Sequence, residues 1–271
     1  NSCLSVIVAK KLKIPVFHME AGNRCFDQIV PEELNRKVVD HLSDINFVLT
    51  EHSRRNLIAE GIKPETIIKT GSHMYEVLNY SSQKINASKI LDNLDLESKK
   101  YFIVSAHREE NVDLEHNLIK LLETLNVLCE VYKIPIIVST HPRTKKRIED
   151  LAKKNINSDI KFLKPFGFVD YIKLQKEAFC VISDSGTITE EASLLGLTAI
   201  TIRETHERPE GMDVGTLIMS SIDKNRVLDA VRIVTSKKFR DSSSEQVLDY
   251  TSNELVSKQI LKVVISYIDY I

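Results

Sequence analysis

The residues best suited to chemistry lie at positions 183–191, where serines, a glycine and two glutamates separate an apolar run from a helical pattern. The apolar run, residues 179–182, is typical of a buried parallel strand. The helical pattern begins at Ile188, and Gly186 predicts a sharp turn between the two elements. Such an arrangement would bind an anion, because free backbone N–H groups and the helix dipole point the same way.

Two interpretations of this stretch stay open. In the first, Glu190 and Glu191 suit the dipole of the first helical turn, and one of them accepts hydrogen bonds from a sugar diol. The stretch would then be a cradle for phosphate and ribose. In the second, it is an ordinary capped helix of an α/β domain, with Ser185 or Thr187 as the N-cap. The local residues favour the two interpretations equally.

Other polar side chains follow apolar runs elsewhere in the chain. Taken singly, each is typical of a surface loop. Together they stand at the carboxyl ends of successive predicted strands, where open α/β sheets bind ligands. They are Glu20, Arg24, His107, Arg108, His141, Arg143, Ser185 and Arg203.

Two further segments suggest contacts to a nucleotide. The loop at 203–211 is dense in both charges, and Arg203 or Arg208 could hold a diphosphate through bidentate hydrogen bonds. Phe166 and Phe168 stand on either side of a glycine and could flank a base. For Phe166, a place in the hydrophobic core is at least as well supported.

The elements that must position these residues alternate regularly between strands and helices, which predicts an α/β fold with parallel sheets. We expect two doubly wound domains. The predicted division is 1–75, a crossing segment at 76–100, a second domain at 101–252 and a C-terminal helix at 253–271. Strands are predicted at 16–19, 45–49, 67–70, 101–105, 134–139, 160–163, 179–182 and 198–202. Helices are predicted at 2–12, 52–61, 114–132, 144–154 and 168–177, and from Ile188 to Gly196. A further helix is predicted to begin at Pro31, with Leu34, Val38 and Leu42 as its apolar stripe and with Glu32 and Arg36 four positions apart on another face.

Composition limits the function classes. The 271 residues include 37 lysines and arginines against 38 aspartates and glutamates, so no footprint for nucleic acid or anionic membrane is present. No apolar run approaches the ~20 residues of a membrane helix. The eight glycines form neither a dinucleotide fingerprint nor a P-loop, and no metal-binding motif occurs. The four cysteines lack a CxxC spacing and indicate a reducing cytoplasm.

Five motifs, in one order along the chain, resemble those of the non-hydrolysing bacterial UDP-N-acetylglucosamine 2-epimerases. This resemblance implies a GT-B-like fold, in which two Rossmann-type domains face each other across a cleft, with the first domain incomplete here. The motifs are His18-x-Glu20-Ala21-Gly22-x-Arg24, Pro31-Glu32-Glu33-x-Asn35-Arg36, His107-Arg108-x-Glu110-Asn111, Asp184-Ser185-Gly186-x-x-x-Glu190-Glu191 and Glu207-Arg208-Pro209-Glu210.

The resemblance also implies roles for individual residues. Glu20, Glu32 and His107 are the expected catalytic residues. The expected ligands of a UDP-sugar are Arg24, Arg36, Arg108, His141, Phe168, Ser185, Gly186, Thr187, Glu191 and Arg208. The family implies a homodimer, C2 epimerisation through a 2-acetamidoglycal, and neither cofactor nor metal.

Departures from the family pattern qualify this picture. The family's Gly-Thr-Arg-Pro-type loop and its Gly-Asp-Thr motif are expected upstream of Asn1, so we expect this sequence to be a fragment. Thr187 stands where many relatives carry a second glycine. The runs at 23–27, 141–144 and 203–211 also resemble a capsule-type branch that forms UDP-N-acetyl-L-fucosamine.

Two other function classes stay open: a GT-B glycosyltransferase with the same nucleotide cradle, and a non-catalytic UDP-sugar-binding protein. The three acidic residues Glu20, Glu32 and Glu33 argue mildly against a transferase. Which glutamate serves as acid and which as base stays open.

Overall fold

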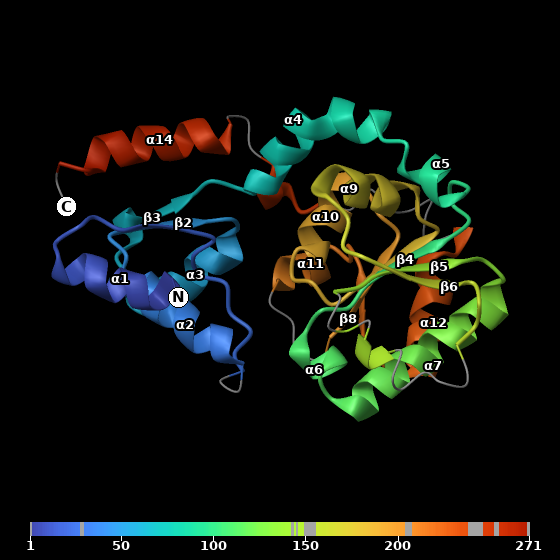
Figure 1. Cartoon of the computed structure of the whole chain (residues 1–271). Helices are drawn as coiled ribbons and strands as arrows, with labels where there is room; N and C mark the ends of the chain where they lie inside the picture. Colours follow the sequence, from blue (N-terminus) through green and yellow to red (C-terminus); the bar gives the residue numbers. More distant parts are fainter. Residues whose placement is uncertain are drawn as a thin grey trace. The chain divides into compact units, whose positions relative to one another are not determined.

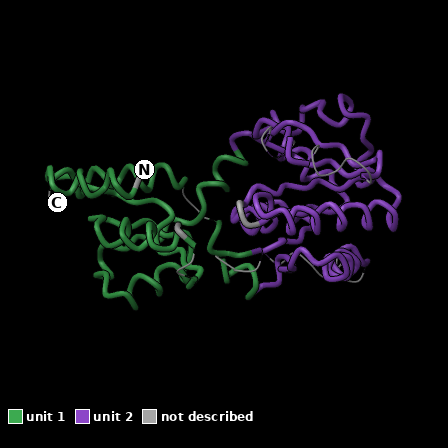
Figure 2. Tube along the Cα trace, turned by 60° about the horizontal axis from the view of Figure 1, so that its bottom comes forward, with its two compact units in different colours: residues 1–79, 205–213, 247–271 green, residues 80–204, 214–246 purple. Residues whose placement is uncertain are grey.

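The structure is a computed structural model that describes residues 2–27, 30–141, 144, 146–148, 156–203, 208–237, 246–251 and 255–269. The chain forms two compact units, coloured separately in Figure 2. Unit 1 comprises residues 1–79, 205–213 and 247–271, and unit 2 comprises 80–204 and 214–246. The division differs from the predicted one, because 205–213 belongs to unit 1 and the first boundary falls inside a helix.

Unit 1 is built on a three-stranded parallel sheet, ordered β1 (Phe17–Met19), β2 (Ile45–Val48) and β3 (Ile67–Lys69). Parallel neighbours require crossover connections, which α2 (Pro31–Leu42) and α3 (Glu51–Ala59) supply. Its other helices are α1 (Ser2–Lys11), the first part of α4 (His73–Ala87), α11 (Pro209–Asp213), α14 (Val256–Tyr267) and two short 3-10 turns, Pro64–Thr66 and Leu248–Tyr250 (Figure 1).

The buried face of α2 is not the predicted apolar stripe. Leu34 is 67% exposed, whereas Glu33 and Asp40 are each only 1% exposed. The reason is the polar loop that follows β1. Glu33 accepts hydrogen bonds from the backbone N–H groups of Cys25 and Phe26, at 3.0 and 3.3 Å. The loop therefore packs against the polar face of α2. Helical periodicity cannot predict this contact, because it depends on residues outside the helix.

Unit 2 contains a six-stranded sheet in the order β6-β5-β4-β7-β8-β9, with every pair parallel. This is the strand order of the Rossmann fold. The strands are β4 (Phe102–Ser105), β5 (Ile136–Ser139), β6 (Ile160–Leu163), β7 (Cys180–Ser183), β8 (Ala199–Ile202) and β9 (Ile218–Ser220). The helices are α5 (Ile90–Leu94), α6 (Glu109–Val112), α7 (Glu115–Tyr132), α9 (Phe168–Glu177), α10 (Ile188–Leu195) and α12 (Lys224–Val234).

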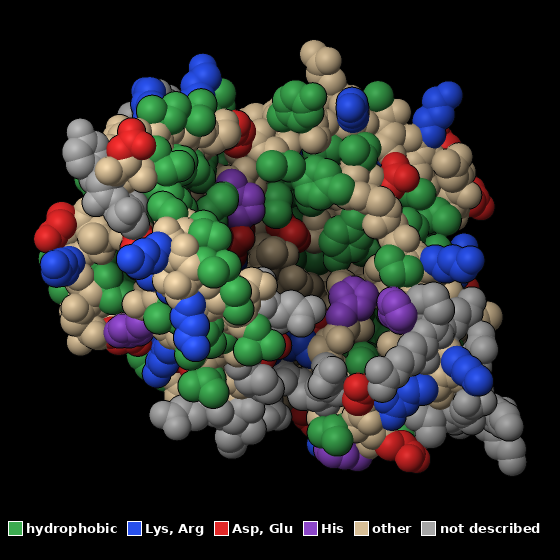
Figure 3. Space-filling model, turned by 60° about the vertical axis from the view of Figure 1, so that its left-hand side comes forward, with side chains coloured by type: hydrophobic (Ala, Val, Ile, Leu, Met, Phe, Trp, Pro, Cys, Tyr) green, Lys and Arg blue, Asp and Glu red, His purple; other side chains and the backbone are tan. Residues whose placement is uncertain are grey.

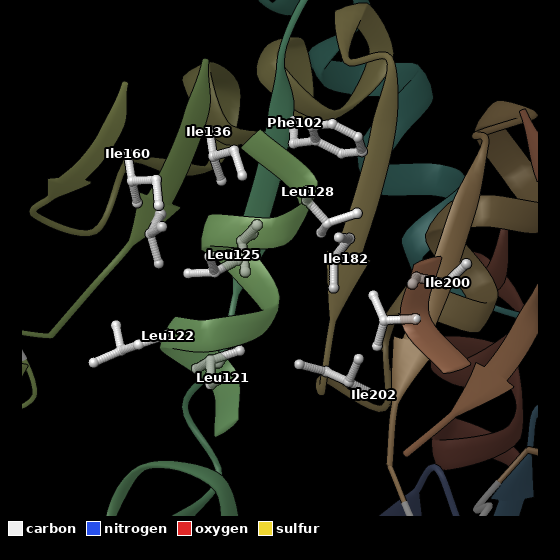
Figure 4. Close-up of a cluster of buried hydrophobic side chains, with 14 of the residues drawn as sticks. Phe102, Leu121, Leu122, Leu125, Leu128, Ile136, Ile160, Ile182, Ile200 and Ile202 are labelled. Atoms are coloured by element: carbon white, nitrogen blue, oxygen red, sulfur yellow. The ribbon is translucent and has the colours of Figure 1, made fainter. Parts of the chain in front are cut away.

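Alternate strand residues of unit 2 enter two separate cores. Phe102 and Val104 face the core under α7 and α12, whereas Ile103 faces the one under α9 and α10. Figure 1 shows these helix pairs on opposite sides of the sheet. Figure 4 shows the first core, where leucines of α7, among them Leu125 and Leu128, meet strand isoleucines. Burial on both faces explains why these strands read as continuous apolar runs.

Several predicted boundaries move by a few residues, and some predicted loops contain helices. The crossing segment is helical: α4 continues to Ala87 and α5 follows it. Leu78, Ser81 and Ile85 are buried at helical spacing there, although the surrounding residues are polar. Helix α11 begins at Pro209, inside the predicted loop at 203–211. The predicted helix at 144–154 lies mostly outside the described residues.

Acidic and basic side chains are interspersed over the face of the molecule in Figure 3, which agrees with the formal net charge of −1. In the part of the chain that the structure describes, no helix combines the length and apolarity needed to cross a membrane.

Candidate nucleotide site

Three adjacent strands of unit 2 end in serine at the same register. Ser105 of β4 pairs with Ser139 of β5 on one side and with Ser183 of β7 on the other. The strand order reverses between β4 and β7, and ligands of doubly wound sheets bind at this switch point, beyond the carboxyl ends. A cavity of about 240 Å³ lies there. It is lined by Ser105, His107, Ser139, Pro165, Phe166, Tyr171, Ser183, Ser185, Thr187 and Glu191.

The turn after β7 forms the predicted helix N-terminus. Helix α10 begins at Ile188, as predicted, and Thr187 is its N-cap residue. The Ser185 hydroxyl accepts a hydrogen bond from the Thr187 N–H, at 3.3 Å. Gly186 does not adopt a positive φ, so the turn does not use the left-handed conformation that glycine allows. The predicted sharp turn between the strand and the helix is present at Gly186.

Glu191 lies at the far side of the same turn and is 7% exposed. Its carboxylate accepts hydrogen bonds from Thr187 Oγ1 at 2.9 Å and from Gln175 Nε2 at 2.6 Å. The side chain is thereby held at both oxygens beside the cavity.

The aromatic side chains of the cavity are Phe166 and Tyr171. Phe168, the expected base contact, is 39% exposed at the start of α9 and lies outside the cavity lining. Burial raises the pKa of Tyr171, so its hydroxyl stays protonated at neutral pH. Tyr171 was not among the predicted site residues, because packing against the sheet decides which face of α9 turns toward the cavity.

His107 is exposed at the cavity, and its loop is anchored from below by Asp184. The buried Asp184 carboxylate accepts hydrogen bonds from the backbone N–H groups of His107 and Arg108 and from the side-chain amide of Asn111. The Arg108 side chain and the exposed His141 do not line the cavity. Arg143 lies outside the described residues.

Unit 1 carries a second polar cluster, around Glu20. Glu20 follows β1 with a φ of +60°, a conformation that costs free energy in a residue with a side chain. Its carboxylate lies 3.5 Å from Arg208 and 3.5 Å from His73. A partly exposed carboxylate between two basic groups is a plausible acid–base centre, and strained backbone often occurs at such sites.

The two α2 residues expected at the site lie as follows. Glu32 is exposed in the first turn of the helix. Arg36 forms an ion pair with Glu33, at 3.9 Å. Arg203 of unit 2 is buried, and its backbone N–H donates to Ser220.

Arg24 is not placed as a substrate ligand. Its side chain has no exposed surface, and its Nε and one terminal nitrogen donate to the carboxylate of Glu60, at 2.8 and 2.6 Å. The other terminal nitrogen bonds the Asn23 carbonyl and lies 2.7 Å from Asp40. All three nitrogens are thus used within the protein, and Arg24 fastens the loop after β1.

A Rossmann-ordered sheet with a polar cavity at its switch point is the architecture of nucleotide-binding α/β proteins. The sequence model of the family described as UDP-N-acetylglucosamine 2-epimerase matches residues 1–264. The chain therefore belongs to the UDP-N-acetylglucosamine 2-epimerase family, and its two Rossmann-type units give it the GT-B-like fold.

Individual relatives agree with this assignment. The structure of UDP-N-acetylglucosamine 2-epimerase from Rickettsia bellii is 57% identical, covers 99% of this chain and 72% of its own, and superposes with a TM-score of 0.93. The Methanocaldococcus jannaschii enzyme, solved in complex with UDP-GlcNAc and UDP, is 34% identical over 96% of this chain and 72% of its own, with a TM-score of 0.85. A curated sequence from the same organism is 37% identical over 86% of this chain, which spans 65% of that relative.

Proposed function

We propose that the protein epimerises C2 of a UDP-N-acetylhexosamine, interconverting UDP-N-acetylglucosamine and UDP-N-acetylmannosamine. The observation that carries this proposal is the cavity of unit 2, where the N-terminus of α10, a carboxylate held by two hydrogen bonds and two aromatic side chains line one space. A nucleoside diphosphate needs this combination of anion site, diol acceptor and apolar wall. Family membership supports UDP as the nucleotide.

The proposed ligand contacts follow from the chemistry of the lining. The base lies beside Phe166 and Tyr171, the ribose hydroxyls bond Glu191, and the diphosphate meets the turn at 185–187. Arg208 and Arg36 are proposed to bind phosphate or sugar oxygens, since guanidinium groups suit bidentate contacts to them. The reaction itself requires neither redox cofactor nor metal.

The reaction explains the need for several acid–base groups. The C2 proton of the hexosamine has no neighbouring carbonyl on the ring, so its direct removal is very unfavourable. When the C1–O bond breaks and UDP leaves with the bond electrons, the C2 proton becomes acidic and a base removes it, giving a 2-acetamidoglycal. Return of a proton to the other face of C2, with re-addition of UDP at C1, inverts the centre. Glu20, Glu32 and His107 are the proposed acid–base residues.

The alternative functions differ in what the protein would do with a UDP-sugar. The alternative substrate is that of the branch which forms UDP-N-acetyl-L-fucosamine from its 6-deoxy-L-talo epimer, which the runs at 23–27, 141–144 and 203–211 also resemble. A GT-B glycosyltransferase would transfer the sugar to an acceptor without exchange at C2. A non-catalytic sensor would bind UDP-sugar without turnover.

The test is solvent exchange. The protein is incubated in D2O with UDP-N-acetylglucosamine or the 6-deoxy-L-talo substrate, and deuterium at C2 is measured by NMR and mass spectrometry. Incorporation in either substrate supports an epimerase and identifies which one. Glu20→Gln should reduce the exchange rate at least about a hundredfold, as expected for loss of an acid–base group. Glu65→Gln, an exposed glutamate in the same unit, is the control. Sugar transfer to an acceptor, or binding without exchange, would contradict the proposal.

We also propose a cytoplasmic location, a homodimer and a role in capsule polysaccharide synthesis. The free thiols of all four cysteines support a reducing compartment. The homodimer and the capsule role rest on the family resemblance, and sedimentation of the purified protein tests the first of them.

A further inference from the structure

Gln175 is a buried amide on α9. It is 2% exposed on α9, while its neighbours Ile172 and Leu174 are buried in the core. Its Nε2 donates a hydrogen bond of 2.6 Å to Oε2 of Glu191. Gln175 is not itself a lining residue, and it contacts two residues that are, Glu191 and Tyr171.

The hydrogen bonds around Glu191 have a fixed direction. An ionised carboxylate only accepts, so both Gln175 Nε2 and Thr187 Oγ1 must donate to it. With its proton used in this way, Thr187 Oγ1 accepts the proton of Ser185 Oγ, 2.9 Å away. One hydrogen-bond chain thus runs from the amide in α9 through the carboxylate to the turn that caps α10.

The buried amide of Gln175 lowers the stability of the fold, and close packing of the core does not require an amide there. The Oε1 atom of Gln175 is buried and, within the described residues, has no hydrogen-bond partner. A buried acceptor without a partner destabilises the fold, and methionine would fill a similar volume without one. A buried acceptor without a partner, directly behind the lining of a binding cavity, points to function.

We infer that Gln175 is a positioning residue that makes the nucleotide site selective for ribose over 2′-deoxyribose by fixing the Glu191 carboxylate. The inference rests on the proposed function. A carboxylate held at both oxygens cannot rotate about its last bond, so it accepts from a vicinal diol in one direction only. A freely rotating carboxylate would still bind a single hydroxyl and would therefore discriminate less.

The experiment is calorimetric titration of UDP and of 2′-deoxy-UDP into the wild-type protein and into Gln175→Met. Wild type should bind UDP at least about tenfold more tightly than the deoxy nucleotide, the size expected for one hydrogen bond to a charged group. Gln175→Met should lose about tenfold in affinity for UDP and change little for 2′-deoxy-UDP. Lys176→Met, the next residue of the same helix, should keep the wild-type ratio. Thermal unfolding confirms that each variant is folded.

A second variant, Gln175→Glu, tests the pH dependence of the selectivity, which a merely structural role of Gln175 would not change. Near pH 5.5 the two carboxylates should share a proton that holds Glu191 in place, whereas at pH 8 that proton is lost and the two charges repel, so the variant should be selective near pH 5.5 and discriminate poorly at pH 8. Equal ratios in wild type and Gln175→Met, or equal binding of both nucleotides by wild type, would overturn this inference alone. Failure of wild type to bind either nucleotide would overturn the proposed nucleotide site, and this inference with it.

Discussion

The carboxylate of Asp184 receives the backbone N–H of His107, at 3.1 and 3.0 Å to its two oxygens, although the residues are 77 positions apart. Asn111 donates to the same carboxylate at 2.9 Å. Asp184 directly follows β7 and the His107 loop follows β4, so this contact joins the two sides of the switch point. The position of the proposed catalytic histidine therefore depends on a buried anion beneath it.

Replacing Asp184 by asparagine should damage both stability and activity. The side-chain NH2 of the new asparagine would face backbone N–H groups that now donate hydrogen bonds to the Asp184 carboxylate. We expect a loss of about 2–4 kcal/mol in unfolding free energy, because buried donors lose a charged acceptor. Urea unfolding measures the loss. Asp223→Ala, which removes the N-cap of α12 in the same unit, should cost about 1 kcal/mol and leave UDP affinity unchanged. Similar stabilities of Asp184→Asn and wild type would contradict this account.

Tyr171 is the proposed base contact, and Phe168 is the one expected from the sequence. Tyr171 lines the cavity, and Phe168 is exposed outside its lining. Tyr171→Ala should weaken UDP binding about tenfold, since stacking of one base is worth roughly 1–3 kcal/mol. Tyr171→Phe and Phe168→Ala should each stay close to wild type. Calorimetric titration would disprove the assignment if Phe168→Ala were the weaker binder of the two alanine variants.

The Arg24–Glu60 pair predicts an acid-dependent stability in unit 1. The hydrogen bond from Arg24 holds the pKa of Glu60 below its usual 4.5, so the pair stabilises the folded state above that pH. Glu60→Gln should reduce stability at pH 7 by about 1–3 kcal/mol. The difference from wild type should shrink as the pH falls below 4.5, where Glu60 of the unfolded chain becomes protonated, and should be lost once the pH passes the lower pKa of folded Glu60. A difference that stays constant from pH 7 to pH 3 would show that charge is not its cause.

Much of the fold could be predicted from local sequence patterns. The strand 160–163 and the start of α10 at Ile188 lie where apolar runs and turn residues predicted them. Gly61 and Gly196 follow their helices with φ of +87° and +62°, as predicted for helix-ending glycines. These features depend on neighbours within about four residues, which a sequence displays directly.

The residues whose roles were predicted wrongly or missed are held by partners that are distant in the sequence. Arg24 resembled a substrate ligand in its motif, but Glu60 lies 36 positions away and Asp40 completes the enclosure. Tyr171 was missed because the face that α9 turns toward the cavity is set by packing against the sheet. Gln175 was invisible for the same reason, since its partner Glu191 is on the next helix.

Calorimetric titration of UDP into wild type and into Glu191→Ala tests the central claim most directly, because that carboxylate lies in the wall of the unit 2 cavity. We predict one UDP per chain for wild type and an affinity at least about tenfold lower for the variant, the loss expected for charged hydrogen bonds to the ribose. Equal affinities of the two proteins for UDP would show that the nucleotide does not bind in this cavity.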